Sequence, residues 1–331
     1  MSGAGAEMRD VGAVPDPAGP DGGELIGVAG GARADLEAVR KIAGRGAVVA
    51  IGEHTDPSRV AALVGASPAD DLARFPALRW VHSTAAGVDG WLRPGVLPAQ
   101  VTLTSAAGNG AIPLAEHALM LLLMLSRDAP RWARTQQRHD WERRTHGELA
   151  GARLGIIGYG NSGQDLARKA LACHMEVQAL RRQGSATHDG AVTLHHGDQG
   201  LRELLRTSDM VVVTAPLTEG TAGMIGAEEI ALMPRGAFLV VISRGGIVDE
   251  TALVETLRSG HLGGAGIDAH AEEPLPASSP LWDAPGAIVT PHNAATTPGT
   301  AERGRTIMLE NVGRWVRGEG LRNVVDRAAG Y

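Results

Sequence analysis

The stretch that decides the fold is LGIIGYGNSG at residues 154–163, where an apolar run leads directly into a G-x-G-x-x-G pattern. The run 154–157 predicts a short buried strand, and the residues through 170 predict a helix that opens in the glycines. Gly158 suits a tight turn, Gly160 lets the backbone approach a pyrophosphate, and Gly163 allows close packing of helix on strand. The helix N-terminus adds N–H groups and a favourable dipole for phosphates. These features predict a dinucleotide site, with an ordinary glycine-rich turn as the alternative in a chain of 45 glycines. We assign its phosphate contacts to Gly158, Tyr159, Gly160, Asn161, Ser162 and Gly163.

A regular alternation of strands and helices surrounds this stretch. Short apolar runs predict strands at 153–157, 176–180, 210–214, 237–242, 264–267 and 287–290, mostly separated by helices. Six strands with helical crossovers are typical of a doubly wound parallel sheet. Upstream, strands predicted at 24–29, 47–51 and 78–83 indicate a second parallel α/β unit. The last predicted helix, 300–318, is expected to cross back onto that unit.

These patterns predict an α/β protein of two Rossmann-like or flavodoxin-like domains. The doubly wound nucleotide domain, residues 107–292, would be inserted in a smaller substrate domain made of residues 24–106 and 293–331. Residues 1–23 are rich in Gly, Ala, Pro and Asp and are expected to form a flexible tail.

Composition narrows the choice of partners. The 331 residues carry a formal net charge of −6 and show no basic stripe interleaved with aromatic residues, which argues against nucleic acid and favours a small-molecule ligand. The single cysteine, Cys173, excludes an intramolecular disulfide and a cysteine-cluster metal site, and it fits a reducing compartment. We expect no metal. No secretion signal is evident, and the most apolar segment, 114–126, is too short to span a bilayer. A cytoplasmic protein without a membrane partner is therefore expected.

The predicted helix at 113–126 is apolar nearly all round. Such a helix is typically buried between domains or against a second subunit. We favour the subunit interface, and so predict a homodimer formed through this region.

The end of the second nucleotide-domain strand bears on which dinucleotide binds. An NAD site usually carries Asp or Glu there for the ribose 2′-hydroxyl, but this chain has Arg181 and Arg182. A carboxylate would repel a 2′-phosphate, whereas guanidinium groups can hold it through paired, charge-assisted hydrogen bonds. The pair predicts NADP(H) as the preferred cofactor, with NAD(H) still possible. Two solvated surface arginines are the alternative.

An ordered set of motifs follows: TAPLT at 214–218, ISRGGIVD at 242–249, Asp268, EEPLP at 272–276 and TPHN at 290–293. Together they resemble the D-isomer-specific 2-hydroxyacid dehydrogenase family, which includes D-lactate, D-3-phosphoglycerate and glyoxylate/hydroxypyruvate enzymes. The resemblance covers roughly residues 77–310. It implies a catalytic arginine, glutamate and histidine at Arg244, Glu273 and His292, and cofactor contacts from Thr214, Pro216, Ile242, Ser243 and Asp268. STAAGVD at 83–89 resembles the family's substrate loop, which implies that backbone N–H groups of Ala86 and Gly87 bind a carboxylate; an ordinary exit from strand to turn is the alternative.

The chemistry of the implied reaction requires these residue types. Reduction of a 2-oxo acid adds hydride to the carbonyl carbon while the oxygen takes up a proton, and His292 is the candidate acid. Glu273 would fix the tautomer of that imidazole and stabilise its charged form. Arg244 would clamp the substrate carboxylate and polarise the carbonyl. Singly, each residue could be an ordinary surface or loop side chain; their shared position beyond strand ends favours the site.

Three residues depart from the family pattern. Ser162 replaces an apolar residue, Val241 stands where many members have Asn, and His270 replaces the Phe of Asp-Val-Phe. His270 could lie at the surface or line the pocket, and we expect it at the surface. The predicted function is hydride transfer between NADP(H) and a small 2-oxo acid or D-2-hydroxy acid. The alternatives are oxidation of another small anion, an aldehyde or phosphorus oxyanion, on the same fold, or a non-catalytic, nucleotide-sensing module like the corepressors of this fold.

Overall fold

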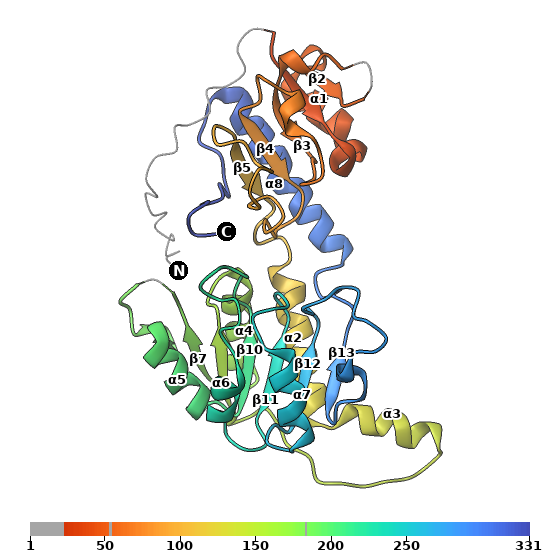
Figure 1. The fold of residues 1–331 in the computed structure, drawn as a ribbon, viewed down its shortest axis with the longest axis vertical. Coiled ribbons are helices and arrows are strands. Elements are labelled where there is room, and N and C mark those ends of the chain that lie inside the picture. Colours follow the sequence, from red (N-terminus) through yellow and green to blue (C-terminus); the bar gives the residue numbers. More distant parts are fainter. Residues whose placement is uncertain (1–22, 53–54, 183) are drawn as a thin grey trace. The chain divides into compact units, whose positions relative to one another are not determined.

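The computed structural model describes residues 23–52, 55–182 and 184–331, and the tail predicted for residues 1–23 lies, except for Gly23, outside the described residues. The described chain forms two compact α/β units (Figure 1). Unit 1 comprises the described residues up to Asn109 together with Ala301–Tyr331. Unit 2 is the continuous segment Gly110–Thr300. The predicted architecture, an α/β unit inserted in a second one, is therefore confirmed.

Unit 1 is built on a five-stranded parallel sheet with the order β2-β1-β3-β4-β5, which is the flavodoxin-like order. Its strands are β1 Leu25–Val28, β2 Val48–Ala50, β3 Val60–Val64, β4 Trp80–Ser83 and β5 Thr102–Ser105, and its helices are α1 Leu36–Ala43 and most of α8 Pro298–Arg317. Short 3₁₀ turns lie at Gly30–Asp35, Arg45–Ala47, Pro57–Arg59 and Leu72–Arg74. As expected, the last helix returns to this unit: Met308, Val312 and Trp315 share a buried core with Ile26 and Trp80.

A buried polar cluster lies in the sheet of unit 1. The Oγ1 atom of Thr104 lies 2.9 Å from Trp80 Nε1, which donates to it, and 2.8 Å from His82 Nδ1. His82 is fully buried, and burial lowers the pKa of its imidazole to about 4. The ring is therefore neutral in the folded protein at neutral pH.

This burial predicts that unit 1 loses stability in mild acid. An unfolded histidine takes up its proton near its ordinary pKa of 6.5, whereas the folded one does so only near 4. The unfolded state thus binds more protons between these values, and lowering the pH through this window is expected to cost about 3 kcal/mol of unfolding free energy. Urea titrations followed by tryptophan fluorescence at pH 7 and pH 4.5 should show the loss in the native protein and not in His82→Gln. The matched control, His188→Gln, alters an exposed histidine. An equal acid sensitivity in His82→Gln would contradict the prediction.

Unit 2 contains an eight-stranded sheet with the order β13-β12-β11-β10-β6-β7-β9-β8. Its strands are β6 Arg153–Ile157, β7 Glu176–Leu180, β8 His188–Asp189, β9 Val192–His195, β10 Met210–Val213, β11 Phe238–Val241, β12 Gly264–Ile267 and β13 Ala287–Val289. Every pairing is parallel except that of β8 with β9. The helices are α2 Ala111–Ser126, α3 Ala129–Gln137, α4 Asn161–Ala172, α5 Gly197–Thr207, α6 Ala227–Leu232 and α7 Glu250–Arg258, with a 3₁₀ turn at Pro280–Asp283. The strand order changes direction between β6 and β10, and this switch point is where doubly wound sheets bind ligands.

All six strands predicted for unit 2 are present. The sequence did not predict four strands, namely β8 and β9 in unit 2 and β3 and β5 in unit 1.

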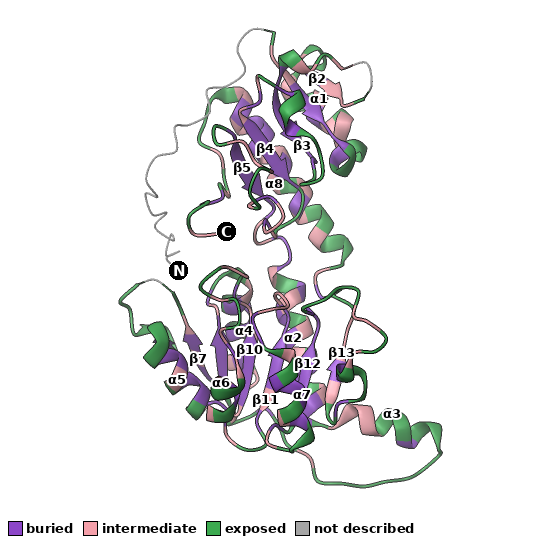
Figure 2. Cartoon of the chain, in the orientation of Figure 1, coloured by how far each residue is buried: buried purple, intermediate pink, exposed green. Residues whose placement is uncertain are grey.

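Helix α2 is buried on one side only (Figure 2). It packs against α4, β11 and β12, and Gly266 on β12 leaves just enough room for Leu121. The opposite stripe exposes the apolar side chains of Ile112, Met120 and Leu123, each slightly more than 40% accessible. Within the part of the chain that the structure describes, no helix has the length and hydropathy of a membrane span.

Candidate active site

The glycine turn of unit 2 has the geometry of a phosphate cradle. Gly158 follows β6 with a φ of +103°, and a Cβ atom there would lie 2.6 Å from the backbone nitrogen of Ala215. A Cβ atom on Gly163 would lie 2.2 Å from the oxygen of Gly158, so the first turn of α4 closes tightly on the loop. A Cβ atom on Gly160 would meet nothing within 4 Å. The loop is therefore sterically closed on its inner side and open above Gly160.

The same loop suits an anion electrostatically. Gly160 is the N-cap of α4, with no side-chain cap and no acidic residue in the first turn, which holds Asn161 and Ser162. Backbone N–H groups at such an end, with the helix dipole, attract phosphate. Thr214, at the end of β10, donates its hydroxyl hydrogen to the oxygen of Gly158 and so fixes the loop to the neighbouring strand. These residues fit the pyrophosphate of a dinucleotide.

Two exposed arginines, Arg181 and Arg182, directly follow β7. The nearby Tyr159 is buried and donates its hydroxyl to Asp189 at 3.0 Å. Burial, with this hydrogen bond, raises the pKa of Tyr159 to about 12. Tyr159 thus stays protonated and links the glycine turn to the β8–β9 hairpin.

The predicted acid and its partner are brought together. His292 Nδ1 lies 2.9 and 2.7 Å from the two carboxylate oxygens of Glu273, so the ring donates this N–H to the carboxylate. Burial by itself raises the pKa of the Glu273 carboxyl, but hydrogen bonds from His292 and from the backbone N–H of His270 outweigh it and bring the pKa below its usual value. Glu273 is therefore ionised, and the hydrogen bonds to it use Nδ1 of His292 rather than Nε2.

Asp268 holds the loop that carries His292. This fully buried carboxylate accepts hydrogen bonds from the hydroxyl of Thr290 at 2.6 Å and from the backbone N–H groups of Asn293 and Ala294 at 3.1 and 3.0 Å. His292 itself has a φ of +47°, a left-handed conformation that costs energy for a residue with a Cβ atom. The hydrogen bonds to Asp268 on both sides keep the turn in that conformation.

One residue of this network was missed by the sequence analysis. His117 on α2 places Nε2 at 3.1 Å from Thr290 Oγ1 and 3.6 Å from Asp268 Oδ1. Because the Thr290 hydroxyl donates to Asp268, it can accept the N–H of His117. The signal for His117 was available: with Glu116 it interrupts a mostly apolar helix.

The loop of Arg244 is locked against the loop of Glu273. A Cβ atom on Gly245 would lie 1.9 Å from the backbone oxygen of His270 and 2.4 Å from the nitrogen of Ala271. Glu250, in the first turn of α7, accepts the N–H of Ala271 at 2.7 Å. The loop of Arg244 and the loop of Glu273 are therefore in direct backbone contact.

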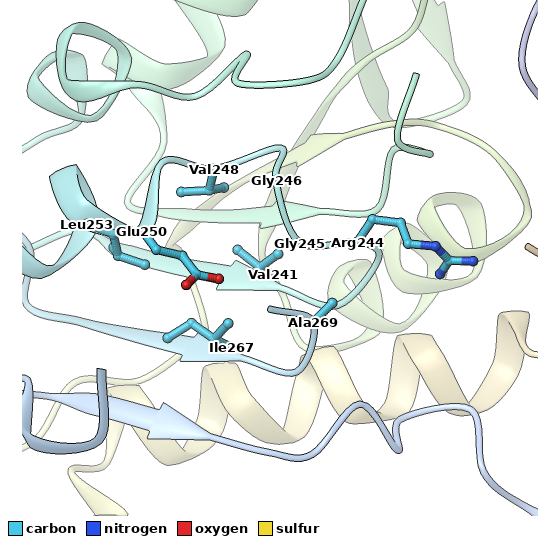
Figure 3. A pocket seen from close by; sticks show the side chains of 9 residues that line it. All are labelled: Val241, Arg244, Gly245, Gly246, Val248, Glu250, Leu253, Ile267 and Ala269. Carbon is cyan, nitrogen blue, oxygen red and sulfur yellow. The ribbon is translucent and has the colours of Figure 1, made fainter. Parts of the chain in front are cut away.

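A small cavity lies beside these loops (Figure 3). Its volume of about 10 Å³ matches one water molecule rather than a substrate. The side chain of Arg244 points away from the other lining residues in Figure 3, and its Nη1 atom donates to the oxygen of Ser243 at 2.8 Å. Arg244 is thus aimed away from this cavity.

The expectation that His270 lies at the surface was wrong. Its side chain is buried, and its Nε2 atom lies 3.0 Å from the oxygen of Thr290. The position belongs to the packed loop between β12 and Glu273, so a ring there must face inward. Of the remaining predicted residues, Ile242 is buried, and Pro216 accepts the hydroxyl hydrogen of Thr221. Ala86 and Gly87 lie in the loop after β4 in unit 1.

The strand order, the glycine cradle and the polar groups beyond the strand ends define unit 2 as a Rossmann-type dinucleotide-binding domain of a dehydrogenase. Residues 119–294 match the family model described as D-isomer specific 2-hydroxyacid dehydrogenase, NAD binding domain. The chain belongs to this family.

Relatives and solved structures agree with this assignment. The chain is 37% identical over 246 residues to the (S)-sulfolactate dehydrogenase of Chromohalobacter salexigens, covering 73% of this chain and 79% of that one. It is also similar to a D-isomer specific 2-hydroxyacid dehydrogenase from Xanthobacter autotrophicus Py2 solved with NADPH and MES, with a TM-score of 0.81, 32% identity and coverage of 93% and 100%. The NADPH-dependent glyoxylate/hydroxypyruvate reductase of Sinorhizobium meliloti, solved with NADP and sulfate, has a TM-score of 0.80, 30% identity and the same coverage.

Proposed function

We propose that this protein is an NADP(H)-dependent reductase of a small 2-oxo acid, which it interconverts with the D-2-hydroxy acid. The observation that carries the proposal is the pair of His292 and Glu273, joined by hydrogen bonds of 2.9 and 2.7 Å. The pair follows strands that run parallel to β6, so it lies at the same sheet edge as the glycine turn. An acid beside a nicotinamide site is the arrangement that carbonyl reduction needs.

Each residue of the proposed site has a separate role in the reaction. When bound, the nicotinamide supplies the hydride. His292 holds a proton on Nε2 for the carbonyl oxygen, while Glu273 orients the ring through Nδ1 and stabilises its positive charge. Arg244 supplies a cation for the substrate carboxylate. In unit 1, the backbone N–H groups of Ala86 and Gly87 are assigned to substrate binding. In the reverse direction His292 accepts the hydroxyl proton.

The preference for NADP(H) is assigned to Arg181 and Arg182, with NAD(H) as a weaker ligand. Both guanidinium groups are exposed at the end of β7, and similar chains have been solved with NADP or NADPH. Thr214, Pro216, Ile242, Ser243 and Asp268 are proposed to complete the cofactor site.

The reaction is tested by following the absorbance of NADPH at 340 nm with glyoxylate, hydroxypyruvate, pyruvate and phenylpyruvate. Consumption of NADPH with at least one of these acids is expected. Inactivity against the whole panel, with NADPH binding intact, would reject the 2-oxo acid assignment in favour of another small anion.

Arg181→Asp should reverse the cofactor preference. The carboxylate repels the 2′-phosphate and can accept the ribose 2′-hydroxyl of NADH, so we expect Kd for NADPH to rise about 100-fold while Kd for NADH stays within a few-fold. Titrations of intrinsic fluorescence with each nucleotide measure both constants. Arg206→Asp, on α5, is the matched control for loss of an exposed arginine. If the ratio of the Kd values for NADPH and NADH were native in Arg181→Asp, the assignment of Arg181 to the 2′-phosphate would be wrong.

We also propose that the protein is a homodimer formed through α2. Its exposed stripe of Ile112, Met120 and Leu123 is unusual for a surface helix, and Trp141, in the segment after α3, is 93% accessible. The double change Met120→Glu and Leu123→Glu is expected to yield monomers in multi-angle light scattering, because charges would be buried without partners. Ile42→Glu changes a comparably exposed apolar residue of α1 and should leave the dimer intact. A dimeric double variant would place the interface elsewhere.

A further inference from the structure

His196, a residue with no assigned role, lies beside the arginines of the cofactor site. It directly follows β9, and β9 pairs in parallel with β7, so the two strands end at the same edge of the sheet. The N–H of Arg181 donates to the oxygen of His195 at 2.9 Å, which joins the two strand ends. His196 is thus fixed next to the segment that presents Arg181 and Arg182.

Both ring nitrogens of His196 face backbone oxygens. Nδ1 lies 3.0 Å from the oxygen of Arg181, and Nε2 lies 2.9 Å from the oxygen of Ala186. A carbonyl oxygen can only accept a hydrogen bond, whereas a neutral imidazole has one N–H to donate. Only the protonated ring satisfies both contacts. In the neutral form one of the two carbonyl contacts is lost.

We propose that His196 is a third cationic element of the 2′-phosphate site. In its protonated form the ring donates hydrogen bonds to the backbone oxygens of both Arg181 and Ala186, and it thereby sets the preference for NADP(H). This inference rests on the proposed cofactor assignment. A bound phosphate dianion favours the charged ring, and the charged ring in turn holds Arg181 in place through its carbonyl. NADPH binding is therefore coupled to proton uptake, whereas NADH binding is not.

The charges around His196 act in both directions on the protonation of its ring, so a bound ligand can change it. Arg181 and Arg182 at the end of β7 and the N-terminus of α5, which begins at Gly197, oppose a positive charge on the ring. Carboxylates are present on the same set of elements, at Asp189 on β8 and at Asp198 and Glu203 on α5. The other histidines there are His188 and His195, and His195 already contacts Gln178 Oε1 at 2.8 Å. The 2′-phosphate dianion of bound NADPH then favours the protonated ring.

The test is a calorimetric titration with NADPH and with NADH from pH 7 to pH 8.5, in buffers of different ionisation enthalpy. The native protein should bind NADPH about tenfold more weakly at the higher pH and take up protons on binding, with neither effect for NADH. His196→Gln, whose amide cannot carry the charge, should bind NADPH about tenfold more weakly at pH 7 and should take up no proton on binding. Its Kd for NADH should be unchanged, and this result also shows that the variant is folded. His195→Gln, the adjacent histidine, should behave as the native protein does.

Native-like pH dependence and proton uptake in His196→Gln would overturn the inference. If Arg181→Asp changes the nucleotide preference and His196→Gln does not, the inference fails and the cofactor assignment stands. If neither variant changes the preference, both fail.

Discussion

Replacing His292 by asparagine is expected to lower kcat for 2-oxo acid reduction by about 10²- to 10⁴-fold, because the carbonyl oxygen loses its proton donor. Asparagine is the least disruptive substitute, since it tolerates the left-handed backbone that His292 adopts at a φ of +47°. Steady-state rates with saturating NADPH measure the loss. Kd for NADPH should remain native, because the phosphate cradle lies at the other end of the proposed cofactor site.

Glu273→Gln is the companion variant. An amide can still accept the Nδ1–H of His292 but cannot stabilise a charged ring, so a smaller loss of kcat is expected. The alkaline decline of kcat should also begin at a lower pH. If His292→Asn retained native kcat, the proton would have to come from another group, and the proposed division of roles would be wrong.

Gly245→Ala is expected to have an effect of similar size without removing any reactive group. Its Cβ atom would lie 1.9 Å from the backbone oxygen of His270, and backbone atoms cannot rotate away as a side chain can. The loops of Arg244 and Glu273 must then separate. A displacement of about 1 Å can cost about 10²-fold in rate, so kcat/KM should fall by at least that factor. Overpacking should also lower the unfolding free energy by about 1–3 kcal/mol.

Gly246→Ala provides the matched control for this prediction. Gly246 has a φ of +80°, but a Cβ atom there would meet only Leu217 at 4.0 Å. Its cost is local backbone strain, about 1 kcal/mol, without a collision with the Glu273 loop. Thermal melts and NADPH titrations separate instability from misplaced loops. Native kcat/KM in Gly245→Ala would show that the two loops are not locked together.

Much of the fold was predictable because unit 2 alternates apolar strands with helices in a regular way. The missed strands have physical reasons. Thr102–Ser105 is a buried strand of mostly polar residues, which hydropathy does not mark, and Val60–Val64 is a short apolar run that periodicity cannot distinguish from a helix. His188–Asp189 pairs only with the neighbouring β9, at the sheet edge. Such a short strand depends on its partner rather than on its own sequence.

The positions of the candidate site residues beyond strand ends could be predicted from motifs, but their connections could not. Motifs placed Arg244, Glu273 and His292 beyond strand ends, and the structure joins the last two directly. That His270 faces inward depends on packing in three dimensions. The collision of a side chain at residue 245 with the backbone of His270 likewise depends on packing in three dimensions. His117 stands out in the sequence as a polar residue in a mostly apolar helix, but its link to Asp268 joins two distant segments, and no local pattern identifies that partner.

The discontinuity of unit 1 has a consequence for synthesis on the ribosome. Unit 2 is one uninterrupted segment, so all of its strands are available once residue 300 has emerged. The sheet of unit 1 is synthesised before unit 2, yet its core lacks Met308, Val312 and Trp315 until α8 has been synthesised. The sheet of unit 1 therefore stays incompletely packed while unit 2 is synthesised. Helix α8, which follows unit 2 in the chain, completes the core beneath the sheet of unit 1.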